Sequence, residues 1–215
     1  MKRETVLAIR RIVLGISAGA FVSLIILVAM ESAGGLDDPI RHAFYAMRSE
    51  ALTVVITCIT YLSDKVVIIA MCIILLIIPW TRLRFGVPLS AGALALTIIN
   101  HLIKAGVERP RPEVLHLVEE GGFSFPSGHS SNSFFFYGLA IYLVRTQVEN
   151  RTVANVLTVV FALLMILIGP TRIYLGVHYP TDVLGGWCLG LVAVIVEVEI
   201  LEYLRLKKES AATLE

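Results

Sequence analysis

The sequence predicts an all-α integral membrane protein with six transmembrane helices, an interfacial amphipathic helix and a short half-helix between spans one and two. The 215 residues are 57% hydrophobic and only 16% charged, whereas soluble domains average about 25% charged residues. The mean hydropathy is +0.82. Apolar runs recur along the chain at lengths that can cross about 30 Å of hydrocarbon.

The six predicted spans follow apolar runs at residues 12–30, 66–80, 87–103, 134–144, 153–168 and 183–201. The first run has 19 residues and only a weak cleavage site after it, so we expect a retained helix rather than a signal peptide. The fourth run is short, but it extends back through small polar residues that neighbouring helices can satisfy. Gly186 and Gly190 in the sixth run predict close packing against another helix.

Residues 34–62 are predicted to hold the two shorter elements. Asp37, Asp38 and Pro39 have the pattern of a helix start, with an acidic N-cap before a first-turn proline. Apolar side chains then recur at helical spacing, at Ile40, Phe44 and Met47. Residues 51–62 are too short to span, which predicts a re-entrant segment or a helix packed between others. Ser63 and Asp64 are expected to cap the second span.

Residues 1–209 are predicted to form a single membrane domain, and residues 210–215 a disordered tail or a vector-derived remnant. Cys58, Cys72 and Cys188 lie in apolar stretches and are expected to be small buried hydrophobes rather than disulfide or metal ligands. The net charge of +1 gives no support for nucleic-acid binding. The sequence indicates no obligate protein partner.

The distribution of Lys and Arg predicts the orientation in the membrane. With six spans, both termini and the loops 81–86 and 145–152 share one side, which carries 11 of the 18 Lys and Arg residues. That side is predicted to be cytoplasmic in a multi-pass protein of the cell membrane. The loops after the third and fifth spans then share the extracytoplasmic side.

Three polar clusters interrupt the apolar sequence, and the first contains Lys104 and Arg111. Prolines at 110 and 112 restrict the backbone around Arg111, so its cation is expected to be held in place. Arg offers a planar fork that fits two phosphate oxygens, while Lys acts as a point charge. Lys104 could instead be a cation that extends to the membrane interface, and for Arg109 that interpretation is favoured.

The second cluster is the run from Pro126 to His129, at the start of the fourth span. A helix N-terminus offers unpaired N–H groups and a partial positive charge to an anion. Gly128 lets the backbone approach an oxyanion closely, the Ser127 hydroxyl can donate, and His129 can reach a leaving-group oxygen. The alternative is a capped helix with an interfacial histidine.

The third cluster contains Arg172, His178 and Asp182, after a predicted break at Gly169-Pro170. Pro180 suits a first helical turn, which places His178 at the head of the sixth span with Asp182 one turn along. A carboxylate behind an imidazole fixes its tautomer and makes the outer nitrogen a better nucleophile. A His–Asp pair at this spacing can also be simple helix capping. The three clusters together favour one shared site, because charges in a membrane protein are costly without a function.

The clusters resemble the three signature motifs of the type 2 phosphatidic acid phosphatase superfamily: Lys104-x6-Arg111-Pro112, Pro126-Ser127-Gly128-His129 and Arg172-x5-His178-x3-Asp182. Thr171 stands where the family usually has serine. The resemblance implies that His178 is the nucleophile, that Asp182 orients it, and that His129 protonates the leaving oxygen. It also implies a phosphate site that comprises Lys104, Arg111, Arg172, Ser127 and Gly128, with neither metal nor cofactor.

The function that the resemblance implies is hydrolysis of a lipid phosphate in the outer leaflet through a phosphohistidine. Phosphatidylglycerophosphate, undecaprenyl pyrophosphate and phosphatidate are the candidate substrates. Residues 121–125 are expected to be either a mobile aromatic gate or a loop plugged into the protein. The alternatives are an anion-binding transporter, which usually has its site near midplane within inverted repeats, and vanadate-dependent peroxidase chemistry.

Overall fold

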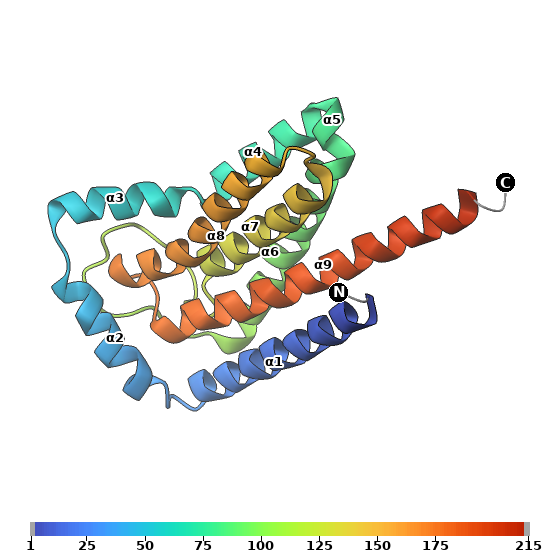
Figure 1. Cartoon of the computed structure of the whole chain (residues 1–215). Helices are drawn as coiled ribbons and strands as arrows, with labels where there is room; N and C mark the ends of the chain where they lie inside the picture. The colour runs from blue at the N-terminus through green and yellow to red at the C-terminus, as the bar shows by residue number, and fades with distance from the viewer. Residues whose placement is uncertain (1–2, 213–215) are drawn as a thin grey trace.

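The computed structural model describes residues 3–212 and is built from helices (Figure 1). In chain order these are α1 Arg3–Ala29, α2 Gly34–Ala46, α3 Glu50–Tyr61, α4 Lys65–Ile77, α5 Pro79–Thr81, the π-helix η1 Arg82–Gly86, α6 Val87–Val107, α7 Gly128–Gln147, α8 Arg151–Tyr174 and α9 Pro180–Ala212. The start of α1, the end of α9 and α5 lie at one end of the molecule. The helices α2 and α3 and the connection from α6 to α7 lie at the other end.

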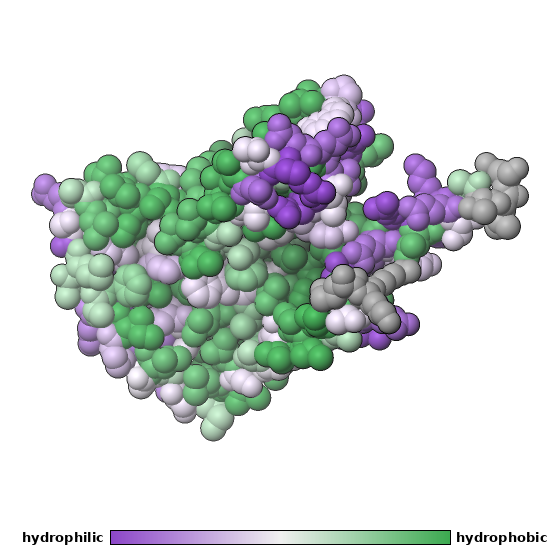
Figure 2. Space-filling view, viewed as in Figure 1, coloured by the Kyte–Doolittle hydropathy of each residue, from purple (hydrophilic) through white to green (hydrophobic). Residues whose placement is uncertain are grey.

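The structure agrees with the predicted class, an all-helical membrane protein. The number of helices in the described part of the chain that are long and apolar enough to cross a membrane is smaller than the predicted six. Within residues 3–212, four helical segments are long and apolar enough to cross a membrane: Glu4–Ala29, Pro79–Val107, Arg151–Tyr174 and Pro180–Ala212. The pair α2 and α3, bent by 120°, makes a fifth if it is counted as one span. Hydrophobic side chains cover the sides of the helices, and hydrophilic ones gather near α5 and along the end of α9 (Figure 2).

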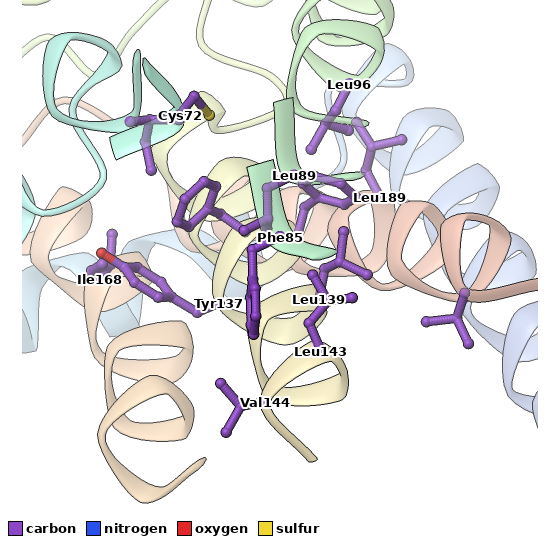
Figure 3. Packing of buried hydrophobic residues seen from close by; sticks show 14 of the residues in the cluster. Cys72, Phe85, Leu89, Leu96, Tyr137, Leu139, Leu143, Val144, Ile168 and Leu189 are labelled. Atoms are coloured by element: carbon purple, nitrogen blue, oxygen red, sulfur yellow. The ribbon is translucent and has the colours of Figure 1, made fainter. Parts of the chain in front are cut away.

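The helix α7 contains the predicted fourth span and is more polar than a lipid-facing helix. It packs against α6, α8 and α9, with its most extensive contacts to α8 and α9. Ser130, Ser131 and Ser133 in its first turns are fully buried. Further along, its apolar side chains form the centre of the hydrophobic core with neighbours from the surrounding helices, among them Leu139, Leu143, Leu89, Ile168 and Leu189 (Figure 3). Because α7 is enclosed by protein, other helices rather than lipid satisfy its polar groups.

The region of the second and third predicted spans differs from the prediction in one respect. The helix α4 begins where expected, with the Asp64 carboxylate accepting from the Val66 N–H at 2.8 Å. It ends at Ile77, and Ile78 is extended, as expected for a residue that precedes proline. From Pro79 the chain is helical through to Val107, so the predicted loop at 81–86 is wrong. The chain reverses at Ile78 instead.

The two shorter elements form as helices, but the start of α2 was predicted incorrectly. The helix begins at Gly34, three residues before Asp37, and its N-cap Ala33 makes no side-chain cap. Asp37 is buried and accepts hydrogen bonds from Arg109 and Thr181 instead. The helix α3 packs against α8, in agreement with the packed alternative.

Two further boundaries differ from the sequence prediction. The helix α8 continues through Gly169 and Pro170 to Tyr174, so the predicted break is wrong, and Arg172 lies in a helical turn. A proline inside a helix removes one backbone hydrogen bond and crowds the carbonyl one turn earlier, but here α9 packs closely against this turn: a Cβ on Gly169 would lie 2.7 Å from Val183. The last helix runs to Ala212, so residues 210–212 of the predicted tail are helical, and residues 213–215 lie outside the described residues.

The predicted close packing of the last helix is confirmed. A Cβ on Gly186 would lie 2.7 Å from the Ser127 carbonyl oxygen, and one on Gly190 would lie 2.7 Å from Phe134 Cβ. The helix α9 therefore approaches α7 at backbone distance, which places the start of α7 against the start of α9. Of the cysteines, Cys72 is buried, Cys188 is half-buried and Cys58 is exposed on α3, so the prediction of burial is wrong for Cys58.

Candidate active site

The three predicted clusters lie together at one end of the helices. Lys104 is in the last turn of α6, Arg172 is in the last turn of α8, and His178 lies two residues before the start of α9. They meet at an open cavity of about 740 Å³. Five of the predicted site residues line it: Lys104, Arg111, Gly128, His129 and His178. Ser127, Arg172 and Asp182 are buried and contact the lining residues or adjoin them in sequence.

His178 and Asp182 form a buried pair at the start of α9. Pro180 is the first residue of that helix, as predicted. His178 Nδ1 lies 3.4 Å from Asp182 Oδ2. Since a carboxylate only accepts hydrogen bonds, Nδ1 carries the proton in this pair. The same Asp182 oxygen accepts from the Tyr179 N–H at 2.8 Å and from the Ser124 hydroxyl, so its position is fixed from three sides.

The other imidazole nitrogen of His178, Nε2, lies 3.3 Å from Arg111 Nη1. A guanidinium group only donates, so Nε2 presents its lone pair, in agreement with a proton on Nδ1. Burial lowers the pKa of His178 to about 3 and outweighs the opposite effect of Asp182, while the charges of Arg111 and Arg172 lower it further. The imidazole is therefore neutral at neutral pH, with an unprotonated nitrogen beside the cavity.

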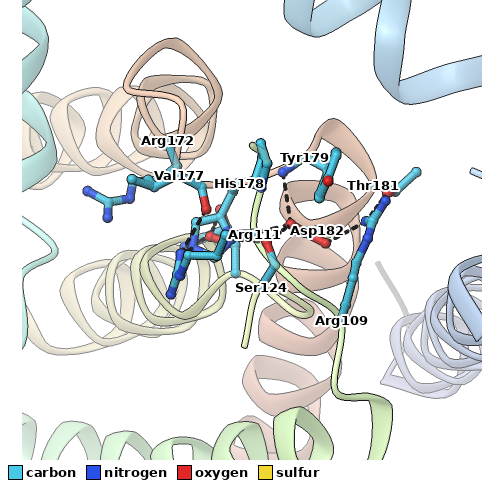
Figure 4. Close-up of polar contacts among 12 residues, drawn as sticks. Arg109, Arg111, Ser124, Arg172, Val177, His178, Tyr179, Thr181 and Asp182 are labelled. Atoms are coloured by element: carbon cyan, nitrogen blue, oxygen red, sulfur yellow. Dashed lines mark hydrogen bonds and ion pairs between the residues drawn. The ribbon is translucent and has the colours of Figure 1, made fainter. Parts of the chain in front are cut away.

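Arg109 was expected to be a cation that extends to the membrane interface, and the structure contradicts this. Its side chain is only 12% exposed and lies between two buried carboxylates. Nη1 donates to Asp182 Oδ1 at 2.7 Å (Figure 4). Nη2 donates to Asp37 Oδ2 at 2.6 Å. Burial lowers the pKa of Arg109, but the Asp182 charge and the Asp37 hydrogen bond outweigh burial and raise it above its usual value.

Lys104 and Arg111 hold the loop 121–125 by its carbonyl groups. Lys104 Nζ donates to the Phe123 oxygen at 2.5 Å, and Arg111 donates to the Gly121 oxygen at 2.8 Å and the Gly122 oxygen at 3.0 Å. Burial is the largest influence on Arg111 and lowers its pKa, with the charges of Glu120 and Asp182 acting in the opposite sense. A phosphate that binds these cations must compete with the loop for their donors.

The same loop is docked through one of its two phenylalanines. Phe125 is fully buried and stacks on Phe21 of α1 at a centroid distance of 5.9 Å. Phe123 is 38% exposed and lines the cavity. The burial of Phe125 agrees with the predicted loop plugged into the protein, whereas Phe123 lies at the opening of the cavity.

Glu120 lies among the cations that were predicted to bind phosphate. Its carboxylate forms an ion pair with Arg172 and lies 3.8 Å from Arg111 Nη2 and 3.8 Å from His129 Nδ1. Arg172 is 2% exposed and also donates to the Thr60 hydroxyl at 3.1 Å. The site thus holds a carboxylate where an anionic ligand is expected, close to both the cations and the second histidine.

The run from Ser127 to His129 forms the first turn of α7, as predicted. Ser127 is the N-cap, and its hydroxyl oxygen accepts from the Ser130 hydroxyl at 2.9 Å. The Ser127 N–H donates to the Asp182 carbonyl oxygen at 3.0 Å, which joins the starts of α7 and α9. Gly128 and His129 line the cavity. A phosphate contact from the fully buried Ser127 hydroxyl stays a prediction.

Sequence reasoning missed four residues of this network: Asp37, Arg109, Glu120 and Ser124. Their partners are distant in the sequence, so no local spacing marks them. One usable signal was the acidic pair at 119–120 beside Gly121-Gly122, in a loop between two cationic clusters. Among residues 3–212, no group of three or more His, Cys, Asp or Glu side chains is placed to hold a metal ion.

Comparison with known proteins gives three relevant similarities. Phosphatidylglycerophosphatase B of Bacillus subtilis (strain 168) is 34% identical over 163 residues, which cover 73% of this chain and 78% of that protein. Undecaprenyl-diphosphatase BcrC of the same organism is 36% identical over 100 residues, covering 44% of this chain and 47% of that protein. The crystal structure of a transmembrane PAP2-type phosphatidylglycerolphosphate phosphatase from B. subtilis superposes with a TM-score of 0.76 at 29% identity, covering 87% of this chain and 96% of that one.

A family model matches the part of the chain that carries all of the predicted site residues, whereas Asp37, Thr60 and the cavity-lining residues Ser63, Asp64 and Lys65 lie before the matched region. The model of the PAP2 superfamily matches residues 85–206, more than half of the chain, and these include all three polar clusters. The chain belongs to the PAP2 superfamily.

Proposed function

We propose that this chain is an integral-membrane phosphatase that removes a phosphoryl group from a lipid headgroup by nucleophilic attack of His178. The observation that carries the proposal is the buried imidazole of His178, whose Nε2 lies 3.3 Å from Arg111 Nη1 beside a cavity lined by cations. The similarity to phosphatases of phosphatidylglycerophosphate and undecaprenyl diphosphate supports the reaction class.

The proposed reaction has two displacements at phosphorus. Nε2 of His178 attacks the phosphorus, the bond to the leaving oxygen breaks, and His129, whose protonated form is favoured by the negative charge of the bound phosphate, gives its proton to that oxygen. Neutral His129 then takes a proton from water, the water oxygen attacks the phosphorus, and the P–N bond breaks to release phosphate and free His178.

The charge that develops on the phosphoryl oxygens needs donors that are already in position. Lys104, Arg111 and Arg172 supply three cations, and the first turn of α7 supplies the Gly128 N–H. Glu120 occupies part of this region in the structure, so phosphate replaces its carboxylate at Arg172 when substrate binds. The cations then exchange one anion for another and are never left buried without a counter-charge.

Phosphate release from four lipids in matched micelles tests the function: phosphatidylglycerophosphate, phosphatidate, lysophosphatidate and undecaprenyl pyrophosphate. We expect hydrolysis of at least one of them, unchanged by EDTA, because the protein cations take the role that Mg²⁺ has in other phosphoryl-transfer sites. The relative rates identify the headgroup. Absence of release from all four lipids would contradict the proposed function, and a strict requirement for added Mg²⁺ would contradict the metal-independent mechanism.

We also infer six membrane crossings, with α4 and α7 added to the four long apolar segments. The starts of α7 and α9 and the ends of α6 and α8 lie at the site, so successive helices from α6 onward alternate in direction. The opposite end carries the connection between α7 and α8 and the end of α9, with Arg145, Arg151, Arg205, Lys207 and Lys208. With six spans, the side that includes this end carries 11 of the 18 Lys and Arg residues, which supports a cytoplasmic location for that end and an extracytoplasmic site.

Cysteine labelling in intact cells tests the orientation. In a background without native cysteines, Leu115→Cys at the site end should react with a membrane-impermeant maleimide. Glu149→Cys, between α7 and α8, should react only after permeabilisation. Both positions are exposed, so access to the reagent decides the result. The reverse pattern would contradict the proposed orientation, and labelling of both positions in intact cells would contradict their separation by the membrane.

A further inference from the structure

Arg109 links two elements that are far apart in the chain, and the resemblance to the family assigns it no role. It lies between α6 and α7, and it joins Asp37 of α2 to Asp182 of α9. Its Nη1 also donates to the Thr181 hydroxyl at 2.7 Å. The guanidinium carbon lies 3.8 Å from the centroid of the Tyr179 ring, so the ring packs against the guanidinium group of Arg109. Asp37 and Asp182 are 1% and 0% exposed, so Arg109 is placed to compensate both charges.

The two oxygens of Asp182 have different partners. Oδ2 faces His178 Nδ1 and accepts from Ser124 and Tyr179, while Oδ1 accepts from Arg109. Figure 4 shows Arg109 and Thr181 on the side of Asp182 away from His178. The Arg109 contact therefore fixes the rotation of the carboxylate and leaves the inner oxygen directed at the imidazole.

Asp37 supports the same turn of α9. Its Oδ1 accepts from the Thr181 N–H at 2.8 Å, and its Oδ2 accepts from the Thr181 hydroxyl at 2.9 Å. The first N–H groups of a helix have no partner within the helix, and Asp37 satisfies one of them from outside. Arg109 therefore contacts two carboxylates. Asp37 anchors the start of α9, and Asp182 contacts His178, the proposed nucleophile.

We propose that Arg109 and Asp37 are positioning residues that hold Asp182 in the rotamer and charge state that keep the proton of His178 on Nδ1. The proposal rests on the proposed function for its catalytic consequence, but its statement about the tautomer does not. Without Arg109, two buried carboxylates lie at the start of α9 without their shared cation, and a buried unpaired charge is strongly unfavourable. A proton on Asp182, or a rotated carboxylate, leaves Nδ1 only the neutral Ser124 hydroxyl oxygen, 3.3 Å away, as an acceptor.

The surroundings of Arg109 allow chemical rescue as a test. A cavity of about 400 Å³ opens beside it, lined by Asp37, Arg109 and Tyr179 among others. In Arg109→Ala, free guanidinium can enter from this side and bind between the two carboxylates. Urea is planar and of the same size but neutral, so it is the matched control ligand. Arg41 lines the same cavity and pairs with Asp38, so Arg41→Ala is the matched control variant.

We expect Arg109→Ala to lower kcat by about 10- to 100-fold, by analogy with the loss of a carboxylate or other partner that orients a metal-ligating histidine. KM should change little, because Arg109 does not line the phosphate cavity. Millimolar guanidinium should restore kcat in a saturable manner, and urea at the same concentration should not. Asp37→Asn in the same background should weaken the guanidinium effect. Arg41→Ala should keep wild-type kcat and show no response.

A second measurement does not need activity. In protein labelled with ¹⁵N-histidine, the resonances of His178 (assigned by their loss in His178→Asn) report the tautomer directly. We expect protonated Nδ1 and bare Nε2 in the wild type, loss of this state in Arg109→Ala, and recovery with guanidinium. An unchanged tautomer in Arg109→Ala would overturn the proposal, as would equal rescue by urea. Failure of the proposed function alone would abolish hydrolysis in the wild type and leave the tautomer result intact.

Discussion

Replacing His178 with asparagine is expected to lower kcat for lipid phosphate hydrolysis by about 10³-fold or more, because the proposed covalent intermediate can no longer form. Asparagine keeps an amide group that can donate to Asp182, so the start of α9 should remain intact. The measurement is phosphate release together with trapping of the phosphoenzyme from ³²P-labelled substrate. A phosphohistidine is stable in alkali and labile in acid, which distinguishes it from a phosphoserine.

The matched variant is His129→Asn, which should behave differently. Loss of a general acid lowers the rate by about 10²- to 10⁴-fold with an alkoxide leaving group. With an aryl phosphate the first step needs no proton, so the phosphoenzyme should form and then accumulate, because water activation is also lost. Labelled phosphoenzyme in His178→Asn, or none in His129→Asn with the aryl substrate, would contradict the assigned roles.

The general fold was predictable from the sequence because long apolar runs form helices in a bilayer, where each backbone polar group must be satisfied within the segment. The exceptions have local causes. Pro79 forces Ile78 into an extended conformation, and the chain reverses there rather than in a loop. The helix α7 is polar for a span because α6, α8 and α9 enclose it, and enclosure by other helices is a tertiary property.

The candidate site was predictable where its residues stand in fixed local spacing. His178 and Asp182 are four residues apart at a helix start, so the geometry of one turn brings them together. The contacts of Arg109 join residues 72 and 73 positions apart in the sequence. Glu120 contacts Arg172 across 52 positions. Only the packing of α2 against α9, and of the loop 108–127 against the ends of the helices, creates these contacts.

Arg172→Gln is expected to lower kcat by about 10²- to 10³-fold, the effect of removing one preorganised donor to a developing oxyanion. Arg172 is 2% exposed, so the charge acts in a water-poor environment in which it is worth more than at the surface. Glutamine can still donate to the Thr60 hydroxyl and keeps much of the side-chain volume. Activity assays and melting in detergent separate a catalytic effect from loss of the fold.

The informative control is Glu120→Gln, which breaks the same ion pair and keeps the Arg172 charge. If the pair served only to hold the loop, the two variants would lose the same activity and the same stability. We expect instead that Glu120→Gln binds inorganic phosphate and vanadate more tightly than the wild type, because the competing carboxylate is gone, while kcat stays within about tenfold of the wild type. Weaker vanadate binding in Glu120→Gln would contradict an exchange of carboxylate for phosphate at Arg172. The reason for the expected difference is electrostatic: both variants lose the Glu120 contact, but only Arg172→Gln removes positive charge from the site where phosphate must be stabilised.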